Sequence, residues 1–211
     1  MRICVISPNL YPLRFGGVSR VVWDQARGLS RRGLDVRVVA CTSPGSGTRR
    51  LHIDNVEVVA IGADRVSFTI RSLREVGRPD IIHVHGLTGS SYGLLRRLGL
   101  LNIPLILTVH HTGIQYVKFM VSFGGLTALK RLASDGMAMA FLEAITPWNA
   151  FDAIICPSEH ISRLLQVYFD ISHDRLSVIP NGVNTDVFRP SEVLRRATRR
   201  KLGLGETDGL V

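Results

Sequence analysis

Histidines end two apolar segments of this chain, and they are the side chains best suited to chemistry. His83 and His85 close the segment Ile81–His85, and His110 closes the segment Leu105–His110. Imidazole donates hydrogen bonds to a sugar hydroxyl or a phosphate near neutral pH. A histidine that only terminates a strand is the alternative, and a metal site is disfavoured because no carboxylate lies nearby in the sequence. Two strands that both end in histidine at one sheet edge favour a ligand site.

A glycine pair, Gly16-Gly17, separates the first apolar segment from the first helical pattern. Glycine permits close approach of the backbone, and the first N–H groups of a helix have no intrahelical partner. That arrangement suits a phosphate or diphosphate. A strand–helix turn that contains glycine and binds nothing is the alternative.

Ser158 is a further candidate site residue, and it directly precedes the helix expected over Glu159–Tyr168. Serine is a good N-cap residue, so capping is the preferred interpretation of Ser158 unless it contacts a ligand.

The elements that must position these residues alternate between strands and helices. Short, continuous apolar runs separated by helical patterns predict an α/β fold in which a parallel sheet carries helices on both faces as three layers. The expected strands are Ile3–Ser7, Val36–Cys41, Val56–Ile61, Ile81–His85, Leu105–His110, Ala153–Pro157 and Leu176–Pro180. The expected helices are Val18–Arg32, Ser67–Val76, Ser90–Leu101, Tyr116–Ser134, Gly136–Ile145, Glu159–Tyr168 and Ser191–Leu202, and Pro44–Arg50 is expected to be a loop.

Composition bounds the class of protein. The chain has 211 residues, a hydrophobic content of 45% and a formal charge of +9, carried almost entirely by arginine. Such a charge predicts attraction to a phosphorylated ligand, an anionic lipid surface or nucleic acid, while a solvated arginine-rich face is the alternative. Nucleic acid ranks last, because the aromatic residues are not interleaved with basic ones as stacking platforms require.

Targeting features point to a cytoplasmic protein. No apolar run is long enough to span a bilayer, and residue 3 already belongs to the first strand, so no cleavable signal is expected. Cys4, Cys41 and Cys156 are far apart, lack metal spacing and lie in or beside apolar strands, as small buried residues of a reducing compartment would.

Five motifs in order give the chain a family resemblance that covers nearly its whole length. It resembles the amino-terminal, Rossmann-like domain of GT-B glycosyltransferases, in the large retaining family four. The matching segments are Met1-Arg-Ile with Pro8 and Gly16-Gly17-Val18, Pro79-Asp-Ile-Ile-His83-Val-His85-Gly86, Pro104-Leu-Ile-Leu-Thr-Val-His110, Phe151-Asp-Ala-Ile-Ile-Cys-Pro-Ser158-Glu159, and Val178-Ile-Pro-Asn181-Gly182-Val183-Asn184 through Phe188-Arg-Pro190.

The resemblance implies roles for individual residues. His110 would touch the transferred sugar as the catalytic residue, and Gly16 and Gly17 would approach the donor diphosphate. The remaining substrate-binding candidates are Asn9, His85, His111, Ser158 and Asn181. The co-substrate would be a nucleotide-diphosphate sugar and the acceptor a sugar or lipid-linked hydroxyl compound. Neither a metal nor another cofactor is expected, because the leaving diphosphate is stabilised by preorganised donors.

The sequence departs from the family in its acidic residues. The family's two donor-binding glutamates are eight positions apart in a second domain, and no two glutamates here have that separation. We therefore expect residues 1–188 to form the acceptor-side domain and residues 189–211 to form a linker helix and the start of a missing donor-binding domain. Asn184, where aspartate is more usual, and the His110-His111 pair are lesser departures.

Two functions follow as hypotheses. The first is the acceptor-binding half of a retaining glycosyltransferase, inactive alone. The second is a non-catalytic module of the same fold that binds a partner or associates peripherally with the anionic inner face of a membrane, as the arginine doublets and the segment Ile114–Trp148 suggest.

Overall fold

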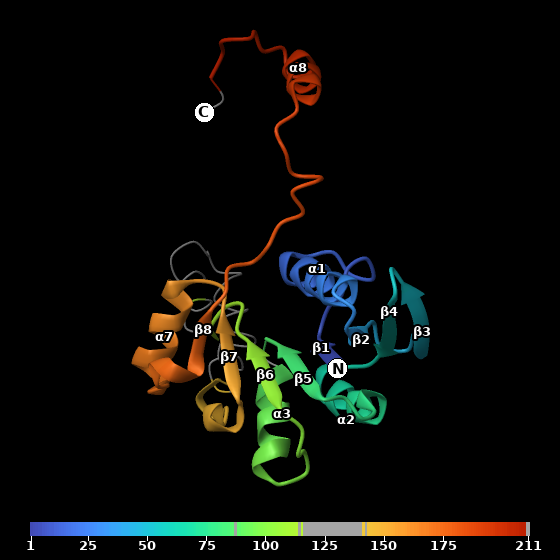
Figure 1. Cartoon of the computed structure of the whole chain (residues 1–211), viewed down its shortest axis with the longest axis vertical. Coiled ribbons are helices and arrows are strands. Elements are labelled where there is room, and N and C mark those ends of the chain that lie inside the picture. Colours follow the sequence, from blue (N-terminus) through green and yellow to red (C-terminus); the bar gives the residue numbers. More distant parts are fainter. Residues whose placement is uncertain (87, 114, 116–140, 142, 210–211) are drawn as a thin grey trace, which may run out of the picture.

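An eight-stranded sheet forms the centre of the computed structural model, which describes all residues except 87, 114, 116–140, 142 and 210–211 (Figure 1). Its order is β3-β4-β2-β1-β5-β6-β7-β8, and every neighbouring pair is parallel except β3 with β4. The strands are β1 Arg2–Ser7, β2 Asp35–Thr42, β3 Thr48–Ile53, β4 Val56–Gly62, β5 Ile81–His85, β6 Leu105–Thr108, β7 Ala153–Cys156 and β8 Leu176–Val178. The predicted parallel α/β sheet is confirmed.

Helices cover both faces of this sheet, as the apolar pattern of β1 requires. Ile3 and Val5 pack in one cluster with Val22 and Trp23 of a single helix, whereas the alternate residues Cys4 and Ile6 belong to the opposite cluster. Successive side chains of a strand point to opposite faces, so each cluster is one layer interface. The helices are α1 Gly17–Arg31 on the first face, α2 Arg65–Val76, α3 Thr88–Arg97 and α7 Glu159–Phe169 on the second, and α8 Glu192–Lys201.

The edge strand β3 corrects the expected loop at Pro44–Arg50. From Thr48 onward the chain is a strand that pairs antiparallel with β4, and Leu51 lies opposite Val58. Its sequence lacks an apolar run because an edge strand buries little. Asp54 and Asn55 both have positive φ, 49° and 62°, as a tight type I′ hairpin turn requires. This residue pair is the sequence feature from which the hairpin could have been predicted.

Several other element boundaries differ from those expected. β6 ends at Thr108 rather than His110, β7 at Cys156 rather than Pro157, and β8 at Val178 rather than Pro180. The third helix spans Thr88–Arg97 rather than Ser90–Leu101. The helix expected over Tyr116–Ser134 lies outside the described residues, as does most of Gly136–Ile145. His110 therefore belongs to a loop that follows a strand.

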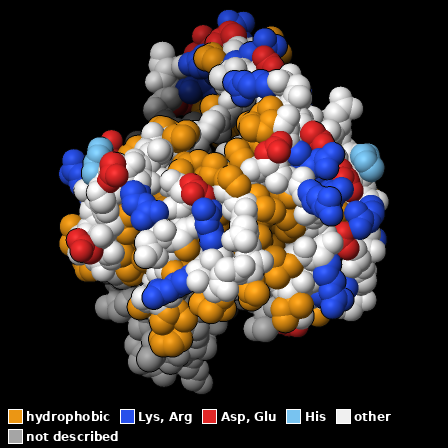
Figure 2. Space-filling model, turned by 60° about the horizontal axis from the view of Figure 1, so that its bottom comes forward, with side chains coloured by type: hydrophobic (Ala, Val, Ile, Leu, Met, Phe, Trp, Pro, Cys, Tyr) orange, Lys and Arg blue, Asp and Glu red, His pale blue; other side chains and the backbone are white. Residues whose placement is uncertain are grey.

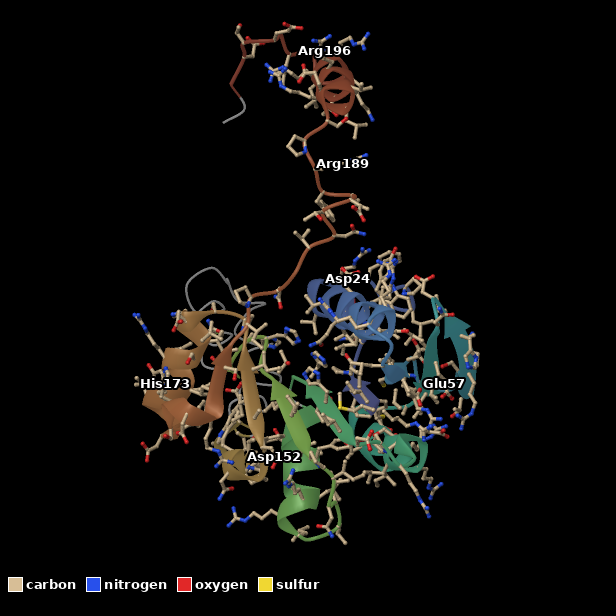
Figure 3. All side chains as sticks on the ribbon, in the orientation of Figure 1. Asp24, Glu57, Asp152, His173, Arg189 and Arg196 are labelled. Carbon is tan, nitrogen blue, oxygen red and sulfur yellow. The ribbon has the colours of Figure 1, made fainter. Side chains whose placement is uncertain are left out.

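The chain beyond β8 leaves the body of the fold. Figure 1 shows residues 179–191 running away from the sheet to α8, and Figure 3 labels Arg189 and Arg196 along this extension. α8 has Ser191 as its N-cap and buries none of its residues. Asn181 lies exposed at the start of the extension.

The cysteines are free thiols: Cys4 and Cys156 are buried, and Cys41 is half-buried. Among the helices that the structure describes, none has the length and apolar character needed to cross a bilayer.

Candidate functional site

The histidine strand ends lie on the face of the sheet that α1 covers. Val5 of β1 packs under α1 and pairs in register with His83, and His83 pairs with Ile106 of β6. Alternation then places His85 on the same face, in register with Thr108 at the end of β6. The parallel register brings two histidine-bearing strand ends to one edge.

Three imidazoles meet at this edge. His85 Nδ1 lies 3.0 Å from His110 Nε2, and the two ring planes are within 17° of parallel with centroids 5.3 Å apart. The His83 ring centroid is 4.4 Å from that of His85, and His83 Nε2 lies 2.7 Å from Thr108 Oγ1. His110 is partly exposed, whereas His85 is fully buried behind it. In this arrangement His85 contacts His110 and presents no surface to a ligand.

Burial keeps these histidines neutral. Desolvation lowers the pKa of both His83 and His110 to about 4, and neighbouring histidines add to the effect. The pKa of His85 falls well below its usual value, mainly through burial and then through repulsion by His83 and His110. At neutral pH the cluster therefore offers hydrogen-bond donors and acceptors without carrying charge.

The turn that leads to the amino terminus of α1 begins where β1 ends, beside the carboxyl end of β5. Gly16 is its N-cap residue and Gly17 its first helical residue; no side chain caps this end, and its first turn contains no acidic residue. Both glycines are exposed, and a Cβ placed on Gly17 would meet no atom within 4 Å. Ser19 Oγ donates to the Gly16 carbonyl over 2.7 Å, which closes the turn. Open backbone N–H groups at a positive helix end can receive an anion.

Asn9 lies between the end of β1 and α1 in a tight turn. Its backbone N–H donates to Ser7 Oγ over 3.3 Å, and the Ser7 hydroxyl donates to the Asn9 carbonyl over 2.6 Å. The side-chain oxygen of Asn9 is buried and has no hydrogen-bond partner among the described residues. A buried acceptor without a partner is costly, so this oxygen has unused hydrogen-bonding capacity within the described part of the chain.

Ser158 and Asn181 lie apart from this cluster in the described contacts, whereas His111 directly follows His110. Ser158 caps α7, accepting from Ile161 N–H over 3.4 Å, and its side chain has no other role in the described contacts. His111 is exposed beside His110. Asn181 follows β8 on the extension, and no described hydrogen bond joins it to the histidines.

Glu143 was not foreseen as a site residue. It is only 2% exposed, and its Oε2 accepts the Gly113 N–H over 2.7 Å, so it holds the loop that follows His110. Burial raises the pKa of Glu143 to about 7. The sequence feature that could have indicated its role is its position as a lone acidic residue in the apolar stretch Met137–Ile145.

Glu143 also borders a small cavity of about 20 Å³ on the α3 side of the loop, enough for one water molecule. His111, Ser90, Thr146 and Trp148 line it with Glu143, and the indole Nε1 of Trp148 is buried without a described partner. Within the part of the chain that the structure describes, no group of three or more His, Cys, Asp or Glu residues could hold a metal ion.

Comparison with known sequences relates the chain to glycosyltransferases. The model of Glycosyltransferase Family 4 matches residues 15–187. The D-inositol 3-phosphate glycosyltransferase of Gordonia bronchialis is 27% identical over 236 residues, covering 100% of this chain and 49% of the relative. The chain spans about half the length of the relatives it matches.

Solved structures give the same fold. The catalytic domain of starch synthase IV from Arabidopsis thaliana, bound to ADP and acarbose, superposes with a TM-score of 0.60 at 15% identity, covering 98% of this chain and 60% of that one. A glycosyltransferase from Rickettsia africae superposes with a TM-score of 0.56 at 15% identity, covering 98% and 50%. The expected Rossmann-like half of a GT-B fold is confirmed.

Proposed function

Because this chain belongs to Glycosyltransferase Family 4, we propose that it is the acceptor-binding half of a retaining glycosyltransferase. The reaction moves a sugar from a nucleotide-diphosphate sugar to an acceptor hydroxyl. The bond from the sugar C1 to the diphosphate oxygen breaks, the acceptor oxygen bonds to C1 on the same face, and the acceptor proton passes to the leaving oxygen. Two observations support the proposal: His110 is held by His85 at the carboxyl end of β5, and the turn after the neighbouring strand β1 leads to an α1 terminus that no side chain caps.

The α1 terminus receives the donor diphosphate. The first-turn N–H groups after Gly16 and Gly17 and the positive end of the helix dipole stabilise the charge that develops as the diphosphate leaves. Gly17 is the closer contact, because the space around its Cα is open. This stabilisation uses backbone donors, and no metal or other cofactor forms part of the proposal.

His110 is the catalytic residue of the proposal and contacts the transferred sugar. It is the partly exposed member of the histidine cluster, and its pKa of about 4 keeps it neutral at pH 7. A neutral imidazole hydrogen-bonds to sugar hydroxyls without attracting the diphosphate away from the helix terminus. Its position is held from behind by His85.

The acceptor binds at the part of this sheet edge that the donor leaves free. The unpaired Oδ1 of Asn9 accepts from an acceptor hydroxyl, and His111 lies next to His110 on the exposed side. A phosphorylated polyol is the acceptor class that we favour, because the relatives are named for inositol 3-phosphate and the chain is strongly cationic. His85 has a supporting role only, and Ser158 and Asn181 are secondary candidates.

The nucleotide is bound outside this chain's described site. Residues 1–188 are the acceptor domain of the proposal, and Asn181 and residues 189–211 lead toward a donor-binding domain that carries the missing glutamate pair. We therefore expect the 211-residue chain to show no turnover by itself, and we place the whole enzyme in the cytoplasm.

Calorimetric titration of the 211-residue chain tests the acceptor assignment. Inositol 3-phosphate should bind measurably, and unphosphorylated inositol should bind at least about tenfold more weakly. A parallel assay with radiolabelled nucleotide sugars should detect no transfer. Equal affinity for both polyols would contradict the proposed acceptor class. Transfer by the chain alone would contradict the proposal that the donor is bound by a separate domain.

A second candidate function, docking on an anionic membrane, is favoured by one surface. α3 exposes Leu94 and Arg97, and the exposed Leu98 and Leu100 follow its end. Figure 2 shows hydrophobic and basic side chains interspersed over this side of the molecule. Against it, Arg96 pairs with Asp152 and Arg50 pairs with Glu57 and Glu75, so part of the arginine charge is already compensated.

Vesicle sedimentation separates the two functions. Membrane docking predicts binding to vesicles rich in phosphatidylglycerol, weak binding to phosphatidylcholine vesicles, and loss of binding in Leu98→Ser. Equal, weak binding to both vesicle types would contradict it.

A further inference from the structure

The orientation of His110 is determined by its hydrogen bond to His85. Nε2 of His110 points inward to His85 Nδ1 at 3.0 Å, so Nδ1 is the ring nitrogen of His110 that remains for a ligand. A neutral imidazole carries one proton, and which nitrogen holds it decides whether Nδ1 donates or accepts.

The two possible proton arrangements differ in what they leave at His85. If His110 donated from Nε2, the proton of neutral His85 would be on its own Nε2, which is buried and has no partner among the described residues. If His85 donates from Nδ1, that same Nε2 has only an unpaired lone pair. Buried N–H groups without a partner are rarer in proteins than acceptors with unused capacity, so the second arrangement is favoured.

The surrounding packing makes this arrangement rigid. His85 is fully buried, the ring of His83 lies against it at 4.4 Å, and His83 is tied to the Thr108 hydroxyl at 2.7 Å. His85 therefore has little freedom to rotate and exchange its nitrogens. Burial also lowers the pKa of His83, His85 and His110, which leaves a single proton between the bonded pair at pH 7.

We propose that His85 is a positioning residue that donates from Nδ1 to Nε2 of His110 and so makes His110 present Nδ1–H, a fixed hydrogen-bond donor, to its ligand. The ligand in question, an oxygen of the transferred sugar, rests on the proposed function, whereas the proton arrangement does not. A donor at this position recognises a hydroxyl or ring oxygen and gives no base for deprotonating the acceptor. Functionally, His85 acts only through His110.

Nitrogen-15 NMR of the 211-residue chain, labelled at histidine, tests the proton arrangement directly. At pH 7 we expect His110 to show a protonated Nδ1 and an unprotonated Nε2, and His85 to show the same tautomer. Protonated Nε2 on His110 would overturn the proposal. Because this readout needs no sugar transfer, it stands or fails independently of the enzymatic assignment.

Matched variants test the cause. His85→Asn keeps an N–H donor near the position of Nδ1 and should preserve the His110 tautomer, whereas His85→Leu keeps the bulk and should abolish it. His173→Asn is the control, since His173 is exposed and has no described hydrogen bond to His85 or His110. An unchanged His110 tautomer in His85→Leu would overturn the proposal, and if that variant does not fold the wild-type spectrum still decides.

Transfer by the full-length protein supplies the functional readout. His85→Leu should lower kcat at least about tenfold, His85→Asn should recover most of the loss, and KM for the acceptor should change little, because a wrong tautomer impairs the reacting geometry more than ground-state binding. A rise in KM with kcat unchanged would contradict a positioning role.

Discussion

His85 and His110 are 25 positions apart in the sequence, and their ring nitrogens lie 3.0 Å apart in the structure. The register of β5 and β6 creates this contact, because it places His85 beside Thr108 and brings the loop after Thr108 over the His85 ring. His110, a loop residue, is thereby held in place by a hydrogen bond to a residue of the sheet. Preorganisation of this kind is what a catalytic hydrogen bond needs.

Replacing His110 tests its proposed contact with the sugar. His110→Ala should reduce transfer by the full-length protein at least about tenfold, because one preorganised hydrogen bond to the reacting sugar is lost. The thermal midpoint should also fall by several degrees, because the buried His85 loses its hydrogen-bond partner, so transfer is compared at a temperature where both proteins are folded. Steady-state kinetics and thermal denaturation are the measurements, and unchanged transfer would remove His110 from the mechanism.

A negative charge at Gly17 separates the stability of α1 from its proposed anion binding. Gly17→Asp should leave the free energy of unfolding unchanged or raise it by roughly 0.3–1 kcal/mol, because a carboxylate suits the first turn of a helix. The same charge should repel a diphosphate and weaken pyrophosphate binding by the 211-residue chain more than about tenfold.

Gly17→Ala is the matched control for that experiment. A methyl group there meets no atom within 4 Å, so pyrophosphate titration should give nearly the wild-type affinity. If the alanine and aspartate variants bind pyrophosphate equally well, the α1 terminus is not the diphosphate site.

Glu143 should make stability depend on pH. Burial raises its pKa from 4.5 to about 7, so between these values the folded carboxyl keeps a proton that the unfolded chain releases. The free energy of unfolding should therefore fall as pH rises through this window, by up to about 3 kcal/mol in total. Glu143→Gln removes this titration while its amide oxygen still accepts from Gly113.

Urea unfolding at pH 5 and pH 8 checks the effect. The glutamine variant should match the wild type at pH 5 and exceed its stability at pH 8. Parallel pH profiles for the two proteins would show that Glu143 does not titrate in this window. Glu143→Ala should be less stable at both pH values, because the buried Gly113 N–H loses its acceptor.

Ser158 is expected to act as a helix cap. Ser158→Ala should lower the free energy of unfolding by about 1 kcal/mol, because Ile161 N–H loses its side-chain acceptor. For a chain of this length the thermal midpoint should fall by about 2–4 °C. Transfer by the full-length protein should be unaffected, and a loss of activity without a loss of stability would instead place Ser158 in the substrate site.

Local patterns were enough to predict most of the fold. Two-sided burial makes each parallel strand a continuous apolar run, and the helices between them bury one stripe each, so Ile3–Ser7 and Val18–Arg32 were predicted to within one residue. Edge strand β3 was missed because it is exposed and its sequence shows neither pattern. Only its Asp54-Asn55 turn marked it.

The sequence by itself determined the layered α/β sheet, the histidines at two strand ends, the glycine turn before α1 and the family to which the chain belongs, since each depends on residue type and short-range spacing. Tertiary structure alone decided that His85 is buried behind His110, which nitrogen of His110 remains free, and that Glu143 holds the loop at Gly113. The physical reason is that burial and ring orientation depend on strand register and on contacts between segments about 25 or more residues apart. No local periodicity encodes those contacts.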